Sequence, residues 1–335
     1  MPYTIKDVAK LANVSTATVS RVLNDQGGYS EKTKQKVLAV IQDLGYEPNA
    51  IARGLVNRRT HTIGFLAPDL TSTFANELLK GVEKAVHDRG SSVIVCHTEN
   101  HGVKTMKYLQ LLHEKRIDGI IYTSHELKEE YYEYIKKMNV PLVLLATETE
   151  QYSVPFVKVN DRAAAFSATE YLIKNGHRKI GLIIGEKSDR IATIPRLEGY
   201  RTALAHYQID FNWDYVIFSD SYFFRDGIAG LRNLREVAPE VTAVFAGSDE
   251  IAMGVLSECY RKNIKVPDRL SVIGYDNIKI AEMTTPALTT IAQPLTAMGE
   301  RSAQMIFTML NGERLVSSQF LPHTIIERES VKNLN

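Results

Sequence analysis

The spacing of hydrophobic and polar residues changes near residue 60. Up to that point apolar residues recur every three or four positions in three short segments, a spacing that is typical of helices. Beyond it, short apolar runs alternate with amphipathic stretches, and this alternation predicts parallel sheets covered by helices on both faces. We therefore expect an α/β protein in which a small helical head precedes a much larger body.

The segment that ends at Gly45 predicts a helix-turn-helix followed by a third helix. Thr4 and Asp7 are spaced as in a capping box, ahead of a one-sided apolar stripe. Ser15 is a favoured N-cap for a second short helix, and a third helix is expected from near Ser30 to Gly45. The inward-facing residues of the second and third helices are expected to be Val19, Val22, Leu23, Val37, Leu38, Val40, Ile41 and Leu44.

With its valines turned inward, the second helix would present small, polar and basic side chains to the outside. Arg21 can donate two hydrogen bonds to a guanine in the major groove, while Ala17 and the Thr16 methyl group can touch a thymine methyl. The short hydroxyls suited to phosphate oxygens are those of Ser15, Thr18 and Ser20. A three-helix module that binds protein is the alternative, but the small basic face favours DNA.

The charge distribution fits a polyanionic partner at the N-terminal end. The net charge is +1, yet residues 1–60 hold nine Lys and Arg against five Asp and Glu. These residues therefore carry +4 and the remainder carries −3. A basic head on a mildly acidic body is consistent with a head that binds nucleic acid.

Several classes of protein are not expected from this sequence. No apolar run approaches the roughly 20 residues that span a membrane, and the N-terminus has no apolar export segment, so a cytoplasmic location is expected. Cys96 and Cys259 lie far apart in apolar segments, which favours buried free thiols over a disulfide or a metal site. An enzyme is the competing class, but phosphate-loop, dinucleotide, nucleophile-elbow and metalloprotease motifs are all missing. We therefore expect no catalytic residues, no cofactor and no metal.

Five stretches of the N-terminal segment resemble the lactose-repressor (LacI/GalR) family of transcription regulators. They are TIKDVA at 4–9, VS at 14–15, TVSRVLN at 18–24, GYEPN at 45–49 and ARGL at 52–55. The resemblance covers essentially the whole chain. It implies a homodimeric repressor of carbohydrate-related genes that binds a pseudo-palindromic double-stranded DNA operator. It also implies control by a small-molecule effector, with a sugar as the first expectation.

The resemblance further implies the domain organisation. A helix-turn-helix head would occupy residues 1–48, a hinge helix residues 49–60, and an effector-binding and dimerisation domain residues 61–335. The hinge is too short for a stable isolated helix, so we expect it to fold only when two copies pack on DNA. Leu55 would then wedge into a minor-groove base step, with packing in a linker as the alternative. Other DNA contacts are assigned to Asn24, Asn49, Ala52 and Arg53.

The body contains nine short runs that predict strands, too many for one small sheet. They are 62–67, 92–97, 119–123, 142–146, 156–159, 180–184, 216–218, 243–247 and 271–274, and a further strand-like run covers 321–328. The resemblance supplies two lobes, as in a type I periplasmic sugar-binding protein, with crossovers near Asn160, Ile291 and Pro322. Lobe 1 would hold about residues 61–160 and 292–321, and lobe 2 about residues 161–291 and 322–335.

Ligands of open parallel sheets sit beyond the carboxyl ends of the strands, so the residues there are candidate effector contacts. They are Asp69, Phe74, Ser124, Asp161, Arg190, Arg196, Tyr222, Phe224, Ser248 and Asp276. The resemblance assigns effector contacts to Arg196, Asp276 and Gln293, a stacking role to the aromatic run 222–224, and a cleft wall to Phe74. An arginine and an aspartate that pair with vicinal hydroxyls beside an aromatic face suit a sugar ring.

Each of these assignments has a structural alternative. Arg196 and Asp276 could form a salt bridge between the lobes, and Asp161, Arg190 and Ser248 could each simply hold a loop. Where many relatives have a polar side chain this protein has Ala192, and Arg190 leaves room for a phosphorylated or acidic ligand.

The last third of the body gives two indications, one about a possible protein partner and one about the oligomeric state. Some relatives respond to a phosphorylated phosphocarrier protein that docks near residues 294–301. In this chain Arg301 could meet the phosphate there, but the adjacent Glu300 would repel it. No leucine heptad follows the final strand-like run, so we expect a dimer and not a tetramer.

Overall fold

The computed structural model describes residues 3–335, apart from residue 24 and residues 47–58, 100–101, 124–125 and 314–315. The chain divides into two compact units, Met1–Thr60 and His61–Asn335, which we call the head and the body. Most of the expected hinge segment lies outside the described residues. Among the helices that are described, none has the length and apolar character needed to cross a membrane.

The head consists of α1 (Ile5–Ala12), α2 (Thr16–Leu23) and α3 (Glu31–Leu44). At the start of α1 the Asp7 carboxylate accepts hydrogen bonds from the backbone N–H and the hydroxyl of Thr4, at 2.8 and 2.7 Å. The helix ends at Asn13, whose left-handed φ of 49° cannot continue a right-handed helix. The turn into α2 is therefore only three residues long.

Ser15 caps α2, as predicted, and Ser30 caps α3, which begins near this residue as expected. Ser15 Oγ accepts from the Thr18 backbone N–H at 3.1 Å, and Ser30 Oγ from that of Thr33 at 3.2 Å. The head core is built by the residues with no solvent exposure, which include Val8, Ala12, Val19 and Val37. Leu38 was predicted to face inward, but it is exposed, because one residue along a helix turns the side chain by about 100° away from Val37.

Lobe 1 of the body is a parallel six-stranded sheet in the order β11-β5-β4-β3-β1-β2. Its strands are β1 (Thr62–Ala67), β2 (Ser92–His97), β3 (Gly119–Tyr122), β4 (Leu142–Leu145), β5 (Phe156–Val159) and β11 (Gln319–Leu321). Its helices are α5 (Thr73–His87), α6 (Thr105–Glu114), α7 (Glu129–Met138) and α12 (Leu295–Leu310). Phe65 packs into the core under α5 and α12, and Leu66 into the core under α6 and α7.

Lobe 2 repeats this plan in the order β12-β10-β9-β8-β6-β7, with β12 antiparallel to β10. Its strands are β6 (Ile180–Ile184), β7 (Val216–Phe218), β8 (Ala243–Ala246), β9 (Ser271–Asp276), β10 (Thr289–Ala292) and β12 (Thr324–Ile326). Its helices are α8 (Asp161–Lys174), α9 (Thr193–His206), α10 (Phe224–Val237) and α11 (Asp249–Arg261), with 3-10 turns η2 (Trp213–Tyr215) and η3 (Lys279–Glu282). The helices cover both faces, so two apolar cores flank the sheet.

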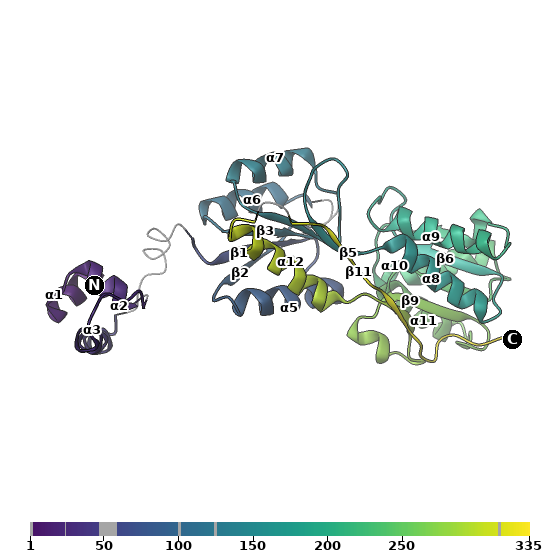
Figure 1. Cartoon of the computed structure of the whole chain (residues 1–335). Coiled ribbons are helices and arrows are strands. Elements are labelled where there is room, and N and C mark those ends of the chain that lie inside the picture. Colours follow the sequence, from purple (N-terminus) through teal and green to yellow (C-terminus); the bar gives the residue numbers. More distant parts are fainter. Residues whose placement is uncertain (1–2, 24, 47–58, 100–101, 124–125, 314–315) are drawn as a thin grey trace. The chain divides into compact units, whose positions relative to one another are not determined.

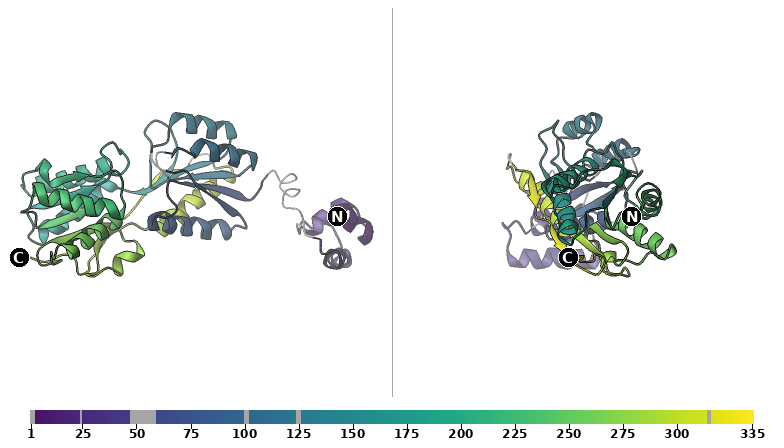
Figure 2. Two further views of the ribbon diagram at one scale, coloured as in Figure 1. Left: turned by 180° about the vertical axis from the view of Figure 1, so that it is seen from behind. Right: turned by 90° about the vertical axis from the view of Figure 1, so that its right-hand side faces the viewer.

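The chain passes between the lobes three times, after β5, after β10 and after β11, and β5 and β11 lie side by side at the junction (Figures 1 and 2). All nine predicted strand runs contain a strand. Strand β10 was not among the predicted runs. The strand-like run 321–328 proves to be a crossover, with β11 ending in one sheet and β12 belonging to the other.

Glycines allow the paired helices of lobe 2 to pack at backbone contact. A Cβ on Gly199 of α9 would lie 2.2 Å from the carbonyl oxygen of Arg162 on α8, and one on Gly227 of α10 would lie 2.0 Å from that of Ile251 on α11. Only glycine permits such an approach. The contact at Gly199 fixes α9 against α8, and these two helices carry the central residues of the site.

Candidate DNA-reading helix and effector cleft

Helix α2 presents an exposed face of small and basic side chains. Thr16, Ala17 and Arg21 are exposed, whereas Val19 and Val22 are buried in the head core, as predicted. Ala17 and Arg21 are four residues apart and therefore lie on one side of the helix. This is the side that a recognition helix would turn toward a major groove.

The hydroxyls of the same helix also serve the head itself. The hydroxyl oxygens of Ser15 and Thr18 lie 2.9 Å apart and share a hydrogen bond, in addition to the capping bond of Ser15. Ser20 is half-buried and makes an interaction of its own. The other predicted DNA contacts fall outside the described residues, and they are Asn24, Asn49, Ala52, Arg53 and Leu55.

A cavity of about 250 Å³ lies where the two lobes of the body meet. Segments at the carboxyl ends of parallel strands line it from both sides, which is where ligands bind to open sheets. Ligand pockets usually measure about 300–1,000 Å³, so this one suits a small molecule. Of the sequence-predicted residues, those that line it are Asp69, Phe74, Arg196, Tyr222, Ser248 and Asp276.

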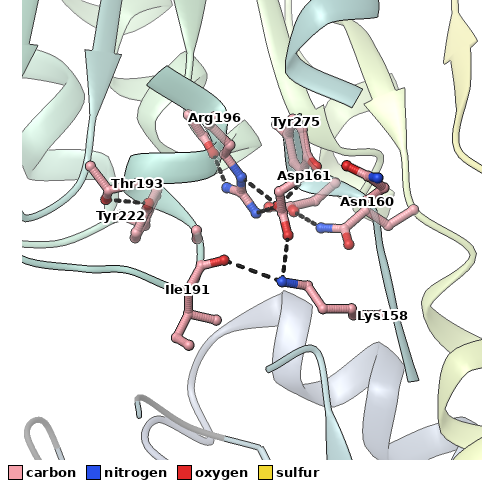
Figure 3. A network of polar contacts seen from close by, with 12 residues as sticks. Lys158, Asn160, Asp161, Ile191, Thr193, Arg196, Tyr222 and Tyr275 are labelled. Carbon is pink, nitrogen blue, oxygen red and sulfur yellow. Dashed lines mark hydrogen bonds and ion pairs between the residues drawn. The ribbon is translucent and has the colours of Figure 1, made fainter. Parts of the chain in front are cut away.

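A buried ion pair forms the floor of the cavity on the lobe 2 side. Arg196 on α9 donates from Nε to Asp161 Oδ1 at 2.9 Å, and its Nη2 lies 2.9 Å from the same oxygen. Its Nη1 donates to the carbonyl oxygen of Gly247 at 2.6 Å. Burial lowers the pKa of the Arg196 guanidinium, but the surrounding acidic groups, Asp161 foremost, together outweigh this and the net pKa is raised. Arg196 is therefore a charge-compensated cation, held by the ion pair with Asp161 that Figure 3 shows.

Two tyrosine rings sandwich this guanidinium. Its central carbon lies 3.8 Å from the ring centroid of Tyr275 and 5.4 Å from that of Tyr222. The Tyr275 hydroxyl donates to Asp161 at 3.0 Å, and the Tyr222 hydroxyl shares a 2.7 Å hydrogen bond with Thr193. Stacking of this kind stabilises a cation and fixes its plane. The orientation of Arg196 is consequently set by its neighbours before any ligand binds.

Lys158 links lobe 1 to the ion pair that forms the floor of the cavity. It lies on β5 and is almost completely buried, yet its Nζ reaches Glu148 at 2.7 Å and Asp161 at 3.2 Å. The same Nζ donates to the carbonyl oxygen of Ile191, in the cleft loop of lobe 2, at 3.3 Å. Figure 3 shows the contacts with Asp161 and with Ile191 meeting at the Lys158 ammonium group. The strand that leaves lobe 1 is thereby bonded to the loop that lines the cleft in lobe 2.

A second carboxylate, Asp276, lines the cavity at the end of β9. Gln293 donates to its Oδ1 at 2.7 Å. Burial raises the pKa of Asp276; the charge of Arg196 opposes this rise and the charge of Asp249 adds to it. Asp249 is itself buried and accepts from the Thr290 hydroxyl and the Ile278 N–H. Gln293 is not among the residues that line the cavity. Through its hydrogen bond it positions Asp276, which does line it.

Asp189 organises the loop between β6 and α9. Its carboxylate accepts hydrogen bonds from the backbone N–H groups of Ile191, Ala192 and Thr193, at 2.8, 3.2 and 3.1 Å. Such a carboxylate acts as the cap that Ala192, at the start of α9, cannot provide. Ser248 plays the comparable role for α11, since its hydroxyl accepts from the Ile251 N–H and donates to the Tyr222 carbonyl.

The remaining predicted effector residues lie elsewhere. Asp161 is buried beneath the cavity, paired with Arg196 and Lys158. Arg190 is exposed and lies off the lining, and Phe223 lines the cavity in place of Phe224. Ser124 falls outside the described residues.

Sequence reasoning missed lining residues of both polar and apolar kinds, and four of them are acidic. The missed acids are Glu186, Asp189, Asp220 and Glu250, and the missed serines are Ser72 and Ser221. Glu250 stands at the start of α11, where an acidic residue is explained by the helix dipole alone and gives no separate signal. The sequence did not point to Lys158 as a buried site residue, because a single lysine in a strand usually marks an exposed edge.

The described part of the chain contains no grouping of three His, Cys, Asp or Glu residues that could hold a metal ion. Cys96 and Cys259 are buried, and burial raises the pKa of Cys96 to about 11 and that of Cys259 to about 12. Neither thiol is therefore activated as a nucleophile.

A helix-turn-helix head and a two-lobed body with a polar cleft define the class of DNA-binding regulators that respond to a small ligand. The chain belongs to the lacI family of bacterial regulatory proteins, whose family model matches residues 4–49. A model described as a periplasmic binding protein-like domain matches residues 169–331. The protein is thus a transcription regulator and not an enzyme.

Relatives match over nearly the full length. Catabolite control protein A of Priestia megaterium is 35% identical, over 99% of this chain and 100% of its own. The transcriptional repressor PurR of Vibrio campbellii is 35% identical, over 99% of both chains. The lac repressor dimer bound to operator and the anti-inducer ONPF superimposes with a TM-score of 0.89, at 26% identity over 99% of this chain and 100% of that one. A complex of the transcriptional regulator CelR with cellobiose gives 0.75, at 29% identity over 98% and 99%.

Proposed function

We propose that this protein is a dimeric repressor of carbohydrate-related genes, whose operator affinity is set by a sugar bound between the lobes of the body. The observation that carries the proposal is the cavity floor, where an oriented guanidinium and a buried carboxylate flank one small space. Paired donors and acceptors beside aromatic rings suit the hydroxyl groups of a sugar.

The residues divide into those that touch the sugar and those that hold them. Arg196 and Asp276 would contact hydroxyl groups, and Tyr222 and Phe74 would form the apolar walls. Asp161 and Gln293 would act through Arg196 and Asp276, because each is bonded to one of them. Binding of cellobiose by the CelR relative supports this class of ligand.

The DNA side of the proposal rests on the exposed face of α2. A symmetric dimer carries two heads, so its operator should be a pseudo-palindrome. The lac repressor relative is a dimer on its operator, which supports the same arrangement here. Sugar binding would change the relative position of the lobes and so the folding of the hinge at residues 49–60. A coupling of about 1–3 kcal/mol would give roughly 5- to 150-fold control.

A thermal-shift screen of neutral mono-, di- and oligosaccharides tests the sensor, with each hit retested on a selected operator duplex by fluorescence anisotropy. We expect a hit to raise the melting temperature of the full chain and to change operator affinity at least fivefold. Asp276→Ala should abolish the shift. Asp268→Ala, an exposed carboxylate paired with Lys332, should not. Hits that bind without altering operator affinity would contradict the proposal.

A second candidate, control by a phosphorylated phosphocarrier protein, is favoured by one contact. Glu300 on α12, which was expected to repel a phosphate, is paired with Lys84 at 2.7 Å. Arg301 is exposed, and its partners are the neutral amides of Gln319 and Gln304. A pull-down with the carrier tests this candidate: binding that needs the phosphate and is lost in Arg301→Ala would support it.

A further inference from the structure

We propose that the effector is a polyhydroxylated molecule that carries a positive charge, of the amino-sugar class, and that the cleft excludes sugar phosphates and sugar acids. The inference rests on the proposed function, since it specifies the ligand of the same cleft. It follows from the balance of charges around the cavity, which is strongly one-sided.

The deep end of the cleft has no cation to spare for an anionic ligand. Arg196 is the one cationic side chain, among the described residues, that lines the cavity, and Asp161 compensates it at 2.9 Å. Lys158 beneath it is held by Glu148 as well as by Asp161. Asp276 adds a further carboxyl group, to which Gln293 donates and on which the already compensated charge of Arg196 also acts. A phosphate here would meet an excess of negative charge.

The mouth of the cleft brings two carboxylates together from opposite lobes. Asp69 follows β1 of lobe 1 and Glu250 starts α11 of lobe 2, and both line the cavity. Ser72 of lobe 1 donates to Glu250 at 3.5 Å, so the two lobes are within contact distance here. Burial raises the pKa of Glu250, the hydrogen bond from Ser72 opposes this rise, and the nearby charge of Asp69 adds to it. The charges of the two acids therefore repel each other.

An ammonium group on the ligand would resolve this repulsion. It could bond to carboxylates of both lobes at once, so it would favour the closed arrangement of the lobes. The hydroxyl groups of the same ligand would reach Arg196 and Asp276 at the floor. Three further acids line the lobe 2 side, Glu186, Asp189 and Asp220, and they increase the attraction for a cation.

Matched sugars that differ only in charge test the inference. We would titrate the full chain, by calorimetry at pH 7, with glucose, glucosamine and glucose 6-phosphate, and with the same three forms of galactose and mannose. In at least one series the amino sugar should bind at least tenfold more tightly than its neutral parent, and the phosphate should not bind. Raising the salt concentration should reduce the preference for the amine, because salt screens the attraction.

Two variants locate the effect. Glu250→Gln and Asp69→Asn should each reduce the ratio of amino-sugar affinity to neutral-sugar affinity at least severalfold. Glu236→Gln, an exposed carboxylate on α10, should leave the preference unchanged.

The outcomes separate the two proposals. Tighter binding of a phosphate or of the neutral parent than of the amino sugar would overturn the charge assignment and leave the sugar-responsive repressor intact. An amine preference that persists in both cleft variants would also overturn it. If no member of any series binds and the broader neutral screen also fails, the proposed function falls together with this inference.

Discussion

Arg196 and Asp161 come from two different helices of lobe 2 and form a buried ion pair, with a distance of 2.9 Å between Arg196 Nε and Asp161 Oδ1. The pair is not the bridge between lobes that the sequence left open, because α8 and α9 belong to the same lobe. Its link to lobe 1 is Lys158, which contacts Asp161 at 3.2 Å. The ion pair therefore sets the geometry of the effector cleft.

Asp161→Ala should destabilise the body strongly. The change leaves the Arg196 and Lys158 charges without their shared partner, and breaking a buried ion pair costs about 3–5 kcal/mol. Urea unfolding followed by circular dichroism measures the loss. Arg162→Ala, on the adjacent exposed residue, should change the free energy of unfolding by no more than about 0.5 kcal/mol. Equal effects of the two variants would contradict this account of the ion pair.

Gly199→Ala should lower stability, although alanine is normally the better helix former by about 1 kcal/mol. The added Cβ would lie 2.2 Å from the Arg162 carbonyl oxygen, so α9 must move away from α8. Forcing atoms into a packed interface costs about 1–3 kcal/mol, and this effect outweighs the helix propensity. Thermal unfolding should show a lower melting temperature than for Glu198→Ala, an exposed change on the same helix. A more stable Gly199→Ala protein would refute the close packing.

Lys158→Met should loosen the loop between β6 and α9. The variant keeps an apolar side chain in the buried site but loses the hydrogen bond to the Ile191 carbonyl. Lys187 and Arg190 in this loop are exposed, so trypsin should cleave there severalfold faster than in the native protein. Mass spectrometry of the fragments identifies the sites. Lys174→Met, which removes an exposed ion pair with Glu170, should leave the cleavage rate unaltered.

Arg21→Ala should weaken binding to the selected operator by about 1–3 kcal/mol, which is roughly 5- to 150-fold. The exposed guanidinium at this position is expected to read a base edge, so a scrambled duplex should be affected much less. Fluorescence anisotropy on the two duplexes gives the ratio. A uniform loss on both would show that Arg21 contacts only phosphate.

Acidification below neutrality should destabilise the body through His177. Its ring bonds to the Thr242 hydroxyl and to the Lys332 carbonyl oxygen, and burial lowers its pKa. Since the folded pKa lies below the unfolded value of about 6.5, its contribution is complete above pH 6.5 and is lost as the pH falls through the folded pKa.

The pH dependence is measured as the melting temperature between pH 7.5 and pH 5. His177→Gln should flatten this curve, because the titration of one histidine changes the free energy of unfolding by at most about 1.4 kcal/mol per pH unit. His206→Gln, on an exposed histidine, should not. Parallel curves for the native protein and His177→Gln would exclude His177 as the cause.

The sequence alone determined most of the elements and the family. Caps such as Ser15 and Ser30, the turn after Ala12 and nine strand runs are local signals, because they depend on residues only a few positions apart. The exposed face of α2 follows in the same way from the burial of Val19 and Val22. The dense motif of the first 55 residues added the family and with it the two-lobed body.

Only the tertiary structure decided which residues of the cleft contact one another. These contacts join residues that are distant in the chain. Asp161 compensates the charge of Arg196, and Gln293 donates a hydrogen bond to Asp276. Lys158 of lobe 1 donates to the carbonyl oxygen of Ile191 in lobe 2. Strand β10 and the acidic mouth formed by Asp69 and Glu250 were equally out of reach. A sequence records which side chains are present, but the energy of a buried charge depends on which other charges the fold places beside it.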